Sequence, residues 1–407
     1  MVLRPLSLES LIAEDHRARG VWAFVEGLDL SELYDGILSV QGRAGRPPID
    51  PRILMALWLY ATVEGVGSAR ALARLCDEHV VYQWICGGVS VNHHTMSDFR
   101  VAHMEVLDRL LTQSVAVLMQ SGLVTLQRVA QDGMRVRTSA GAASFRRGVT
   151  LQKCLDEATA QVEALREEVD KDPTATSRRQ AAAKKRAAED RKKRVEDALA
   201  QYPDAASKRK PSEREKKTRV STTDPEARVM KMPDGGFRPA YNAQLATDTK
   251  TQVIVGVDLT NVGSDQGLMA PMVEQIEQRY GKAPKEMLVD GGFVTRKDIE
   301  QVGAKQVVVY GPVLEPKDPK RDRHQPLPGD CETVASWRTR MGTDEAKEIY
   351  KERAATAECV NAIARNRGLH QFPTRGIEKA TAVLLWFSLA HNMMRGLELL
   401  GSWASGA

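Results

Sequence analysis

The chain has 407 residues, of which 42% are hydrophobic and 27% charged, so it has room for two or three domains and the composition of a soluble globular protein. Its five cysteines lack any C-x-x-C spacing, which argues against a disulfide framework or a zinc knuckle and favours a reducing compartment. The N-terminal stretch has no signal-like apolar region, and the longest apolar runs, residues 53–63 and 380–390, are too short to span a bilayer. We expect a cytoplasmic protein with no membrane partner.

Positive charge is concentrated in one part of the chain. Residues 146–219 hold 21 Lys and Arg against 14 Asp and Glu, whereas the formal net charge of the whole chain is +5. The remainder is therefore slightly negative. This asymmetry suggests an anionic partner that meets one particular segment.

Residues 1–122 are predicted to be helical. Asp50-Pro51 predicts a helix over 52–63, Ser68 can start one over 69–77, and Thr95 can start a long helix to about residue 120. Basic side chains near these helices would suit a helix-turn-helix-like DNA reader. They are Arg43, Arg46, Arg70, Arg74, His93, His94 and Arg100. A plain helical bundle with surface arginines is an equally good interpretation.

The next segment, residues 126–136, alternates apolar and polar positions and is predicted to be a strand, with Asp132 in its middle. A carboxylate inside a strand either lies on the solvated face or points into a site on the sheet.

Residues 147–220 are rich in charge and poor in aromatic residues, and residues 173–220 have too few apolar groups for a core of their own. Breaks at 172–173 and 202–203 indicate a helical arm inserted into the fold. The arm is either a solvated hairpin or a surface for the phosphate backbone of DNA. Its most basic cluster comprises Lys184, Lys185, Arg186, Lys192 and Lys193.

After the arm, strands and helices alternate. Residues 240–246 and 252–259 are predicted to form a β-hairpin, followed by a helix over 267–280 and a short strand over 285–290 that ends at Asp290. A helix over 295–302 and a strand over 305–310 come next. Residues 377–400 are apolar on nearly every side, which predicts a buried helix.

The stretch 349–368 is predicted to be a helix, because it has no Pro and no internal Gly. At about 100° per residue, four polar side chains share one arc of it. They are Tyr350, Arg353, Glu358 and Arg365. The arc suits a group that holds a metal or faces a phosphodiester, although ordinary solvated ion pairs are the alternative.

Without the arm, the element order from residue 126 is three strands followed by alternating helices and strands. This order resembles the RNase H-like fold, an α/β fold with a mixed sheet and flanking helices. In that fold the first and fourth strands are neighbours, so Asp132, Asp290 and Glu358 should meet at one place. Three carboxylates so close together need a cation to offset their charge. Oxygen-only ligation points to Mg²⁺, with Mn²⁺ as a substitute, as a pair roughly 3.5–4 Å apart.

The motifs make the resemblance more specific. GRPPIDPRILMALWLYA, SARAL and HHTMSDFR resemble the helical domain of bacterial insertion-sequence transposases of the DDE class. DGMRVR around Asp132 and VDGGF around Asp290 resemble the strands that carry their first two acids. Residues 350–365 match the family's Tyr-x-x-Arg…Glu…Lys signature, with Arg365 where Lys is common. The segment 221–228 also resembles a family segment, without an evident role.

The resemblance implies a helical DNA-binding domain over 1–122 and a catalytic domain over 123–146 and 221–376. A basic insertion over 147–220 and a packing helix over 377–407 complete the chain. It also implies that Asp132, Asp290 and Glu358 bind the metals, while Tyr350, Arg353 and Arg365 hold the DNA near them. The partner would be double-stranded DNA, both element ends and target, bound by a homodimer in the bacterial nucleoid.

Two other functions stay open: an RNase H-like structure-specific nuclease, and a domesticated DNA-binding protein that no longer cuts. Other acids compete for the site. Asp258 ends a strand that should be remote from the fourth, Asp265 should cap the helix that follows it, and Asp234 and Asp330 lie beside Gly, as turn residues do.

Overall fold

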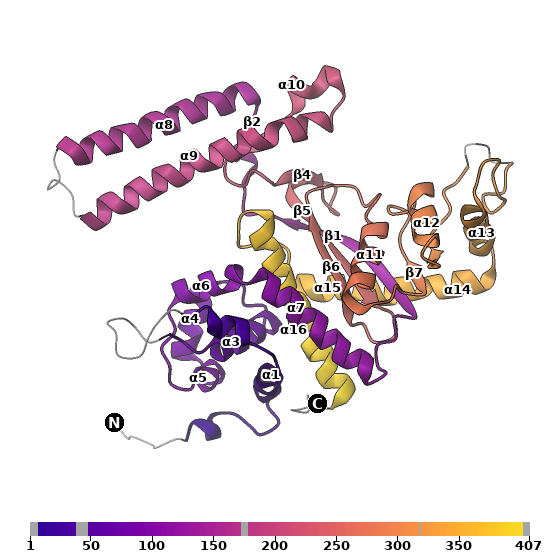
Figure 1. Cartoon of the computed structure of the whole chain (residues 1–407), viewed down its shortest axis with the longest axis horizontal. Helices are drawn as coiled ribbons and strands as arrows, with labels where there is room; N and C mark the ends of the chain where they lie inside the picture. The colour runs from indigo at the N-terminus through magenta and orange to yellow at the C-terminus, as the bar shows by residue number, and fades with distance from the viewer. Residues whose placement is uncertain (1–6, 38–47, 172–177, 317, 319, 402–407) are drawn as a thin grey trace.

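The computed structural model describes residues 7–37, 48–171, 178–316, 318 and 320–401. A helical N-terminal part, a mixed sheet with helices on its faces, and a long projecting helical hairpin are seen in Figure 1. This is the α/β, RNase H-like architecture that the element order predicted. Arg43 and Arg46 lie outside the described residues.

The N-terminal part is helical in all of its described regular elements. These are η1 (Leu8–Leu11), α1 (Arg17–Glu26), α2 (Ser31–Asp35), α3 (Pro51–Val63), α4 (Ala69–Glu78), α5 (Val80–Cys86), α6 (His93–Ala102) and α7 (Met104–Gln120). Asp50 and Ser68 cap α3 and α4, as predicted. The single helix from Thr95 was wrong, because Asn92 caps α6 through the N–H groups of His94 and Thr95 and the chain turns at His103 before α7.

Six strands form the main sheet. They are β1 (Arg128–Arg137), β4 (Arg228–Lys231), β5 (Phe237–Asp248), β6 (Ile254–Thr260), β7 (Glu286–Leu288) and β8 (Val308–Tyr310), in the order β4-β5-β1-β7-β8 with β6 also paired to β5. β1 pairs antiparallel with β5 and parallel with β7. The strand that carries Asp132 is therefore the neighbour of the strand that leads to Asp290, as predicted.

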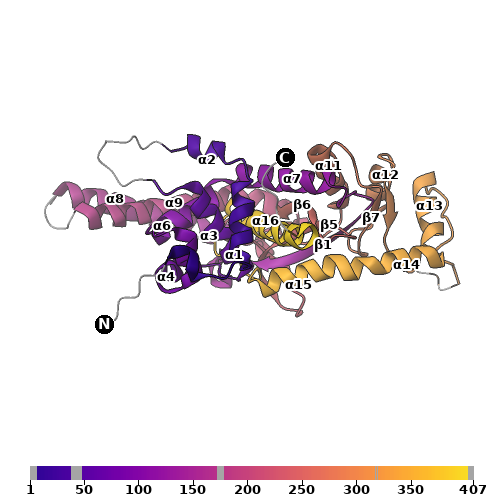
Figure 2. The ribbon, with the colours of Figure 1, turned by 90° about the horizontal axis from the view of Figure 1, so that it is seen from below.

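Helices cover both faces of this sheet. The later elements are α11 (Met269–Tyr280), α12 (Arg296–Gly303), α13 (Glu332–Met341), α14 (Asp344–Arg353), α15 (Cys359–Asn366) and α16 (Ile377–Leu400). In Figure 2, α7 and α11 lie on one side of the strands and α14 and α15 run along the other. The described part of the chain contains no helix that is long and apolar enough to cross a membrane. The cysteines are free thiols.

The basic insertion is a helical hairpin of α8 (Gly148–Lys171) and α9 (Arg178–Ser207), followed by η3 (Pro211–Glu213) and α10 (Arg214–Lys217). β2 (Phe145–Arg146) and β3 (Val220–Ser221) pair where it leaves and re-enters the fold. The prediction that it lacks apolar packing was wrong, because Val162, Val195 and Ala198 are buried between the helices. The break at 202–203 was also wrong, since α9 continues through Pro203. The break at 172–173 lies outside the described residues.

The segment 221–228, which had no role from sequence, joins three parts of the fold. The carboxylate of Asp224 is fully buried and accepts hydrogen bonds from the Tyr241 hydroxyl on β5, at 2.7 Å, and the N–H of Gly376, at 3.2 Å. Glu226 accepts from the N–H of Ile377 at 2.8 Å, at the start of α16. The segment thus fixes the last helix to the sheet beside the base of the arm.

The last helix also binds the outer strand through a buried amide. Asn392 is fully buried on α16. Its Oδ1 accepts from the backbone N–H of Ile254 at 2.8 Å, and its Nδ2 donates to the carbonyl of the same residue at 2.7 Å. Asn392 thereby supplies the pairing that a further strand would give to the edge of β6.

We expect Asn392→Leu to destabilise the protein by about 2–5 kcal/mol, because it leaves two buried backbone groups without partners. The midpoint of urea unfolding measures this change. Lys379→Ala, on the exposed side of the same helix, is the control and should shift stability by less than about 0.5 kcal/mol. Equal stabilities for the two variants would show that the amide does not support the strand edge.

Candidate active site

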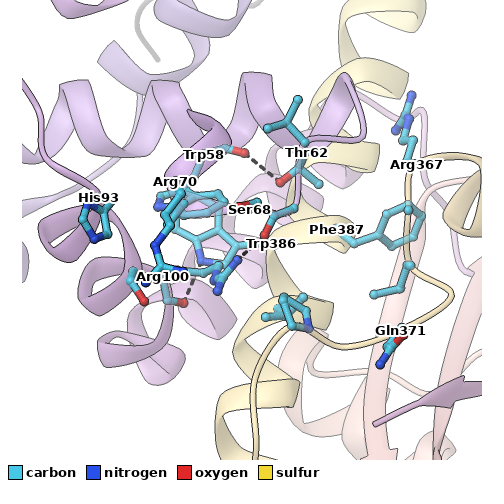
Figure 3. Close-up of a pocket in the computed structure, with 18 of the residues that line it drawn as sticks. Trp58, Thr62, Ser68, Arg70, His93, Arg100, Arg367, Gln371, Trp386 and Phe387 are labelled. Atoms are coloured by element: carbon cyan, nitrogen blue, oxygen red, sulfur yellow. Dashed lines mark hydrogen bonds between the residues drawn. The ribbon is translucent and has the colours of Figure 1, made fainter. Parts of the chain in front are cut away.

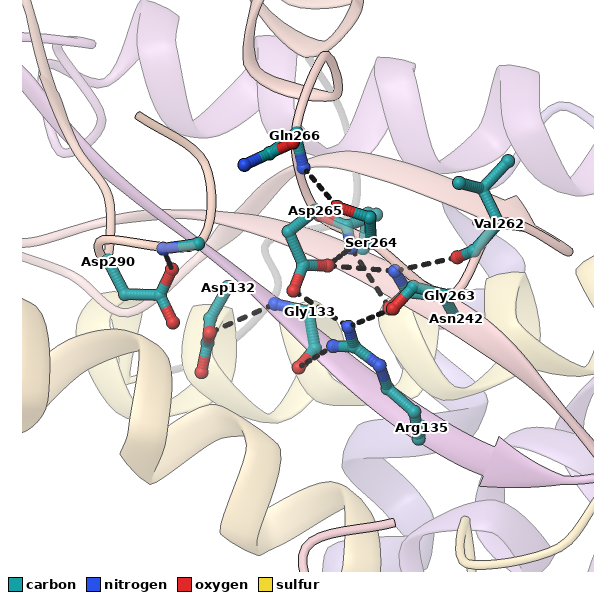
Figure 4. Close-up of polar contacts among 12 residues, drawn as sticks. Asp132, Gly133, Arg135, Asn242, Val262, Gly263, Ser264, Asp265, Gln266 and Asp290 are labelled. Carbon is teal, nitrogen blue, oxygen red and sulfur yellow. Dashed lines mark hydrogen bonds and ion pairs between the residues drawn. The ribbon is translucent and has the colours of Figure 1, made fainter. Parts of the chain in front are cut away.

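Two acids meet because of the register between β1 and β7. In the parallel pair, Ala130 lies opposite Leu288. Asp132 follows Ala130 by two residues, and Asp290 follows Leu288 by two residues. Residues two apart in an extended segment project on the same face. Figure 4 shows the two carboxylates next to one another. The side chain of Asp132 is 16% exposed and that of Asp290 is 39% exposed.

The third acid comes from the long helical run, which is not α-helical throughout. Residues Ala354–Glu358 form a π-helical turn between α14 and α15. In a regular α-helix, residues five apart point about 140° away from one another. The wider π turn places residues i and i+5 on the same side. Arg353 and Glu358 are therefore ion-paired at 3.0 Å.

One guanidinium holds all three acids together. Nη2 of Arg353 lies 3.3 Å from the carboxylate of Asp132 and 3.8 Å from that of Asp290, while Nη1 lies 3.0 Å from Glu358. The other oxygen of Asp132 accepts from Nδ2 of Asn361, at 2.9 Å, one turn beyond Glu358. The cluster thus combines three carboxylates from distant segments with a single positive charge.

Burial makes this cluster electrostatically strained. Burial raises the pKa of Asp132, and the nearby carboxylate of Asp290 raises it further, although Arg353 and the N–H of Gly133 oppose the shift. The half-buried Tyr350 belongs to the same electrostatic group. Burial raises the pKa of its phenol, while the charge of Arg353 opposes that shift. A second cation would relieve the excess of negative charge.

A fourth acid, Asp265, supports the strand beneath Asp132, and its predicted role was wrong. Asp265 was expected to cap a helix, yet α11 has Leu268 at its N-cap and no side-chain cap. Oδ1 of Asp265 accepts instead from Asn242 at 2.8 Å, and its Oδ2 pairs with Arg135 at 2.9 Å (Figure 4). The same Oδ1 also accepts from Gln244 at 2.9 Å.

This network explains the glycine that follows Asp132. A Cβ on Gly133 would lie 2.4 Å from Oδ1 of Asp265 and 2.5 Å from the amide nitrogen of Gln244. Only glycine lets the network approach the strand. The signal in the sequence was the pair of amides at 242 and 244, which lie on one face of the strand and are both fully buried.

The structure also places the other candidates. Arg365 is exposed in the last turn of α15, and Asn361, on the same helix, contacts Asp132. Asp258 is exposed on β6, two strands away from β1, as expected. Asp234 accepts from the N–H of Gly236 in the β4–β5 turn. Asp330 is more than a turn residue, because it forms an ion pair with Arg338 at 2.8 Å.

The residues predicted to bind DNA lie on two surfaces. Arg70, His93, His94 and Arg100 line one pocket of the helical part, and Arg74 pairs with Glu78 at 3.6 Å on its outside. In the arm, Lys184, Lys185, Arg186 and Lys193 are exposed, whereas Lys192 is half-buried and lies 3.8 Å from Glu196.

The donor chemistry of the cluster fits a divalent cation. Carboxylate oxygens from three segments are the ligands that Mg²⁺ and Mn²⁺ prefer. The spacing is that of an ion-paired cluster, however, since among the described residues no three His, Cys, Asp or Glu side chains are placed to hold a metal ion. Arg353 supplies the positive charge in the structure. Asp132, Asp290 and Glu358 are the residues that would hold a cation.

Two family models match the chain. Residues 6–102 match the model described as Transposase domain (DUF772), and residues 204–393 match the Transposase DDE domain. The second match includes Asp290 and Glu358 but begins at residue 204, after β1 and within α9 of the arm. No curated protein and no solved structure matches the chain significantly.

The raised pKa of Asp132 predicts a pH-dependent stability difference. A carboxyl whose pKa is higher in the folded state favours folding only when protonated, so it destabilises the fold as pH rises from about 4 through the raised value. We expect Asp132→Asn to be more stable than the wild type at neutral pH, by a margin that shrinks towards pH 4. Thermal unfolding across this pH range measures the difference. Asp258→Asn is the control. A stability difference between Asp132→Asn and the wild type that does not change with pH would contradict a raised pKa for Asp132.

Proposed function

Because the chain belongs to the DDE transposases of insertion sequences, we propose that it cuts the ends of its element and joins the freed 3′-hydroxyls to target DNA. The observation that carries this proposal is the convergence of Asp132, Asp290 and Glu358 on one guanidinium, from segments on both sides of the arm. Such a cluster suits phosphoryl transfer, which depends on positioning and charge stabilisation more than on covalent chemistry.

In this proposal the three carboxylates hold two divalent cations. Bound there, Mg²⁺ or Mn²⁺ would polarise the scissile phosphate and neutralise the charge that develops on it. Asn361 and the N–H of Gly133 orient the carboxylate of Asp132. Arg353 and Tyr350 then face the DNA phosphates that flank the reacting bond. Asp265 keeps the strand in place beneath Asp132 through Arg135 and the amides of β5.

The same site serves two chemically similar steps. In the first, water attacks the phosphorus at the element end, and the 3′-hydroxyl of the element leaves. In the second, that hydroxyl attacks a phosphodiester of target DNA, and the 3′-oxygen of the target strand leaves. Two ends require two active sites, so the proposed assembly is a homodimer on DNA, acting on the nucleoid in the cytoplasm.

Two other functions make different predictions. A structure-specific nuclease would use the same carboxylates for the first step but would not join strands, and a strand-transfer assay separates it from a transposase. A domesticated DNA-binding protein would not need a supported acidic cluster. The buried network beneath Asp132 and the π turn that positions Glu358 favour an active enzyme over that alternative.

Replacement of any of the three acids should abolish the chemistry. We expect Asp132→Asn, Asp290→Asn and Glu358→Gln each to lower the rate of cleavage of an element end on the order of 1000-fold or more in Mg²⁺, with DNA binding retained. Cleavage of a labelled duplex under single-turnover conditions measures this rate. Asp258→Asn should cut at the wild-type rate; near wild-type cleavage by one acid variant would remove that residue from the site.

The arm is proposed to lie along duplex DNA, because its two helices project away from the sheet (Figure 1) and its lysines at 184 and 185 are exposed. Each neutralised phosphate contributes roughly 0.9 to the slope of log affinity against log salt. We therefore expect Lys184→Gln combined with Lys185→Gln to flatten that slope by about 2 for a random duplex. The matched control, Lys282→Gln with Lys285→Gln, removes the same charge from exposed positions before β7. Identical slopes in both proteins would mean that the arm is only solvated.

A further inference from the structure

A pocket lies between the helical N-terminal part and the end of the catalytic domain. Its volume is about 480 Å³, within the range of pockets that hold small ligands. Figure 3 shows Arg70 and Arg100 on the side of the helical part. Arg367 and Gln371, from the loop after α15, lie on the opposite side, with Phe387 of α16 beside them. The pocket is therefore built by segments that are almost 300 positions apart in the sequence.

The charges that line this pocket are all of one sign. Arg70, Arg100 and Arg367 line it, together with two histidines, and none of its described lining residues is acidic. Arg100 is only 7% exposed, and its Nε has no hydrogen-bond partner among the described residues. The same holds for the buried Nη1 of Arg367. The charges of Glu398 and Glu64 lie close enough to offset part of that of Arg367, whereas among the described residues no carboxylate offsets the buried charge of Arg100. Burying a cation without a counterion is costly, so Arg100 calls for an anion.

Arg100 is held in place by the fold. Its Nη1 donates to the carbonyl of Gly67 at 2.6 Å, and its guanidinium lies 4.8 Å from the ring centroid of Trp58. The indole N–H of Trp386 donates to the backbone carbonyl of Arg100 at 3.0 Å. Burial lowers the pKa of Arg100 to about 10, so the side chain remains charged at neutral pH. The positive charge is a fixed part of the pocket wall.

Two helices point their N-termini at the same pocket. α4 begins at Ala69 and α6 begins at His93, and residues from the first turn of each helix line the cavity. Ser68 and Asn92 cap these helices and satisfy some of the first N–H groups. The remaining partial positive charge at each end favours an anion in the space between them.

We propose that this pocket binds a phosphate group of a nucleotide in the DNA substrate. The proposal rests on the function proposed above, since it takes DNA as the source of the phosphate. Arg367 follows directly after α15, nine positions beyond Glu358. That separation is about 13 Å along a helix. Successive phosphates of one strand advance roughly 3.4 Å along the duplex axis, so a pocket at this distance would receive a phosphate that flanks the reacting bond, not the scissile phosphate itself.

Inorganic pyrophosphate is the probe for the anion site, used with the full-length protein at constant ionic strength. We expect calorimetry to detect one site per chain in the wild type, and Arg70→Gln or Arg367→Gln to raise the dissociation constant about tenfold or more. Arg100→Lys is the obvious variant, but its contacts make misfolding a risk, so the two other positions carry the test. Arg52→Gln is the matched control, because Arg52 is exposed on α3 and does not line the pocket, and it should bind pyrophosphate as the wild type does.

A second titration identifies the source of the phosphate. The same measurement is made with the protein saturated by a random-sequence duplex. Loss of pyrophosphate binding in the complex would show that DNA fills the pocket, as proposed. Unchanged pyrophosphate binding in the complex would overturn the assignment to DNA, and no binding by the wild-type protein would overturn the anion site itself. Neither result depends on cleavage, so failure of the proposed enzymatic function would be seen separately.

Discussion

Three carboxylates share one guanidinium in this protein, and much of the fold is arranged to keep them together. Arg353 reaches Asp132, Asp290 and Glu358 at once, although these acids come from a central strand, a loop and a helix. One positive charge cannot balance three negative charges in a partly buried site. The cluster therefore carries an excess of negative charge, and DDE transposases, the family to which the chain belongs, generally use divalent metals.

The support for this cluster extends through the sheet and into the helices. The parallel register of β1 and β7 fixes two acids, and the π turn fixes the third. Asp265 and the amides of β5 hold the strand from behind, at a position where only Gly133 fits. On the far edge, Asn392 of α16 satisfies the backbone of β6. Because α16 also packs against the N-terminal helices, the catalytic sheet and the helical part form one continuous structure.

Much of this arrangement could be predicted from sequence, because it depends on patterns with clear periods. Alternation and turn residues located the strands, and their order implied that Asp132 and Asp290 meet. The π turn could not be predicted, since a uniform 100° per residue hides one wide turn. Asn361, whose side-chain amide donates to Asp132, was also missed, because only charged side chains and a tyrosine were singled out on this helix. Asp265 was missed because a carboxylate before a helix has a simpler explanation, and its partners at 242 and 244 lie more than twenty positions earlier.

The most direct test of the central claim is a crystal structure of the protein with Mn²⁺, in which anomalous scattering locates the metal. We expect a peak between Asp132 and Asp290, within ligand distance of both carboxylates, and Arg353 moved away from Asp132. Binding of Mn²⁺ elsewhere, with the three ion pairs of Arg353 unchanged at full metal occupancy, would contradict the assignment of these acids as the metal site.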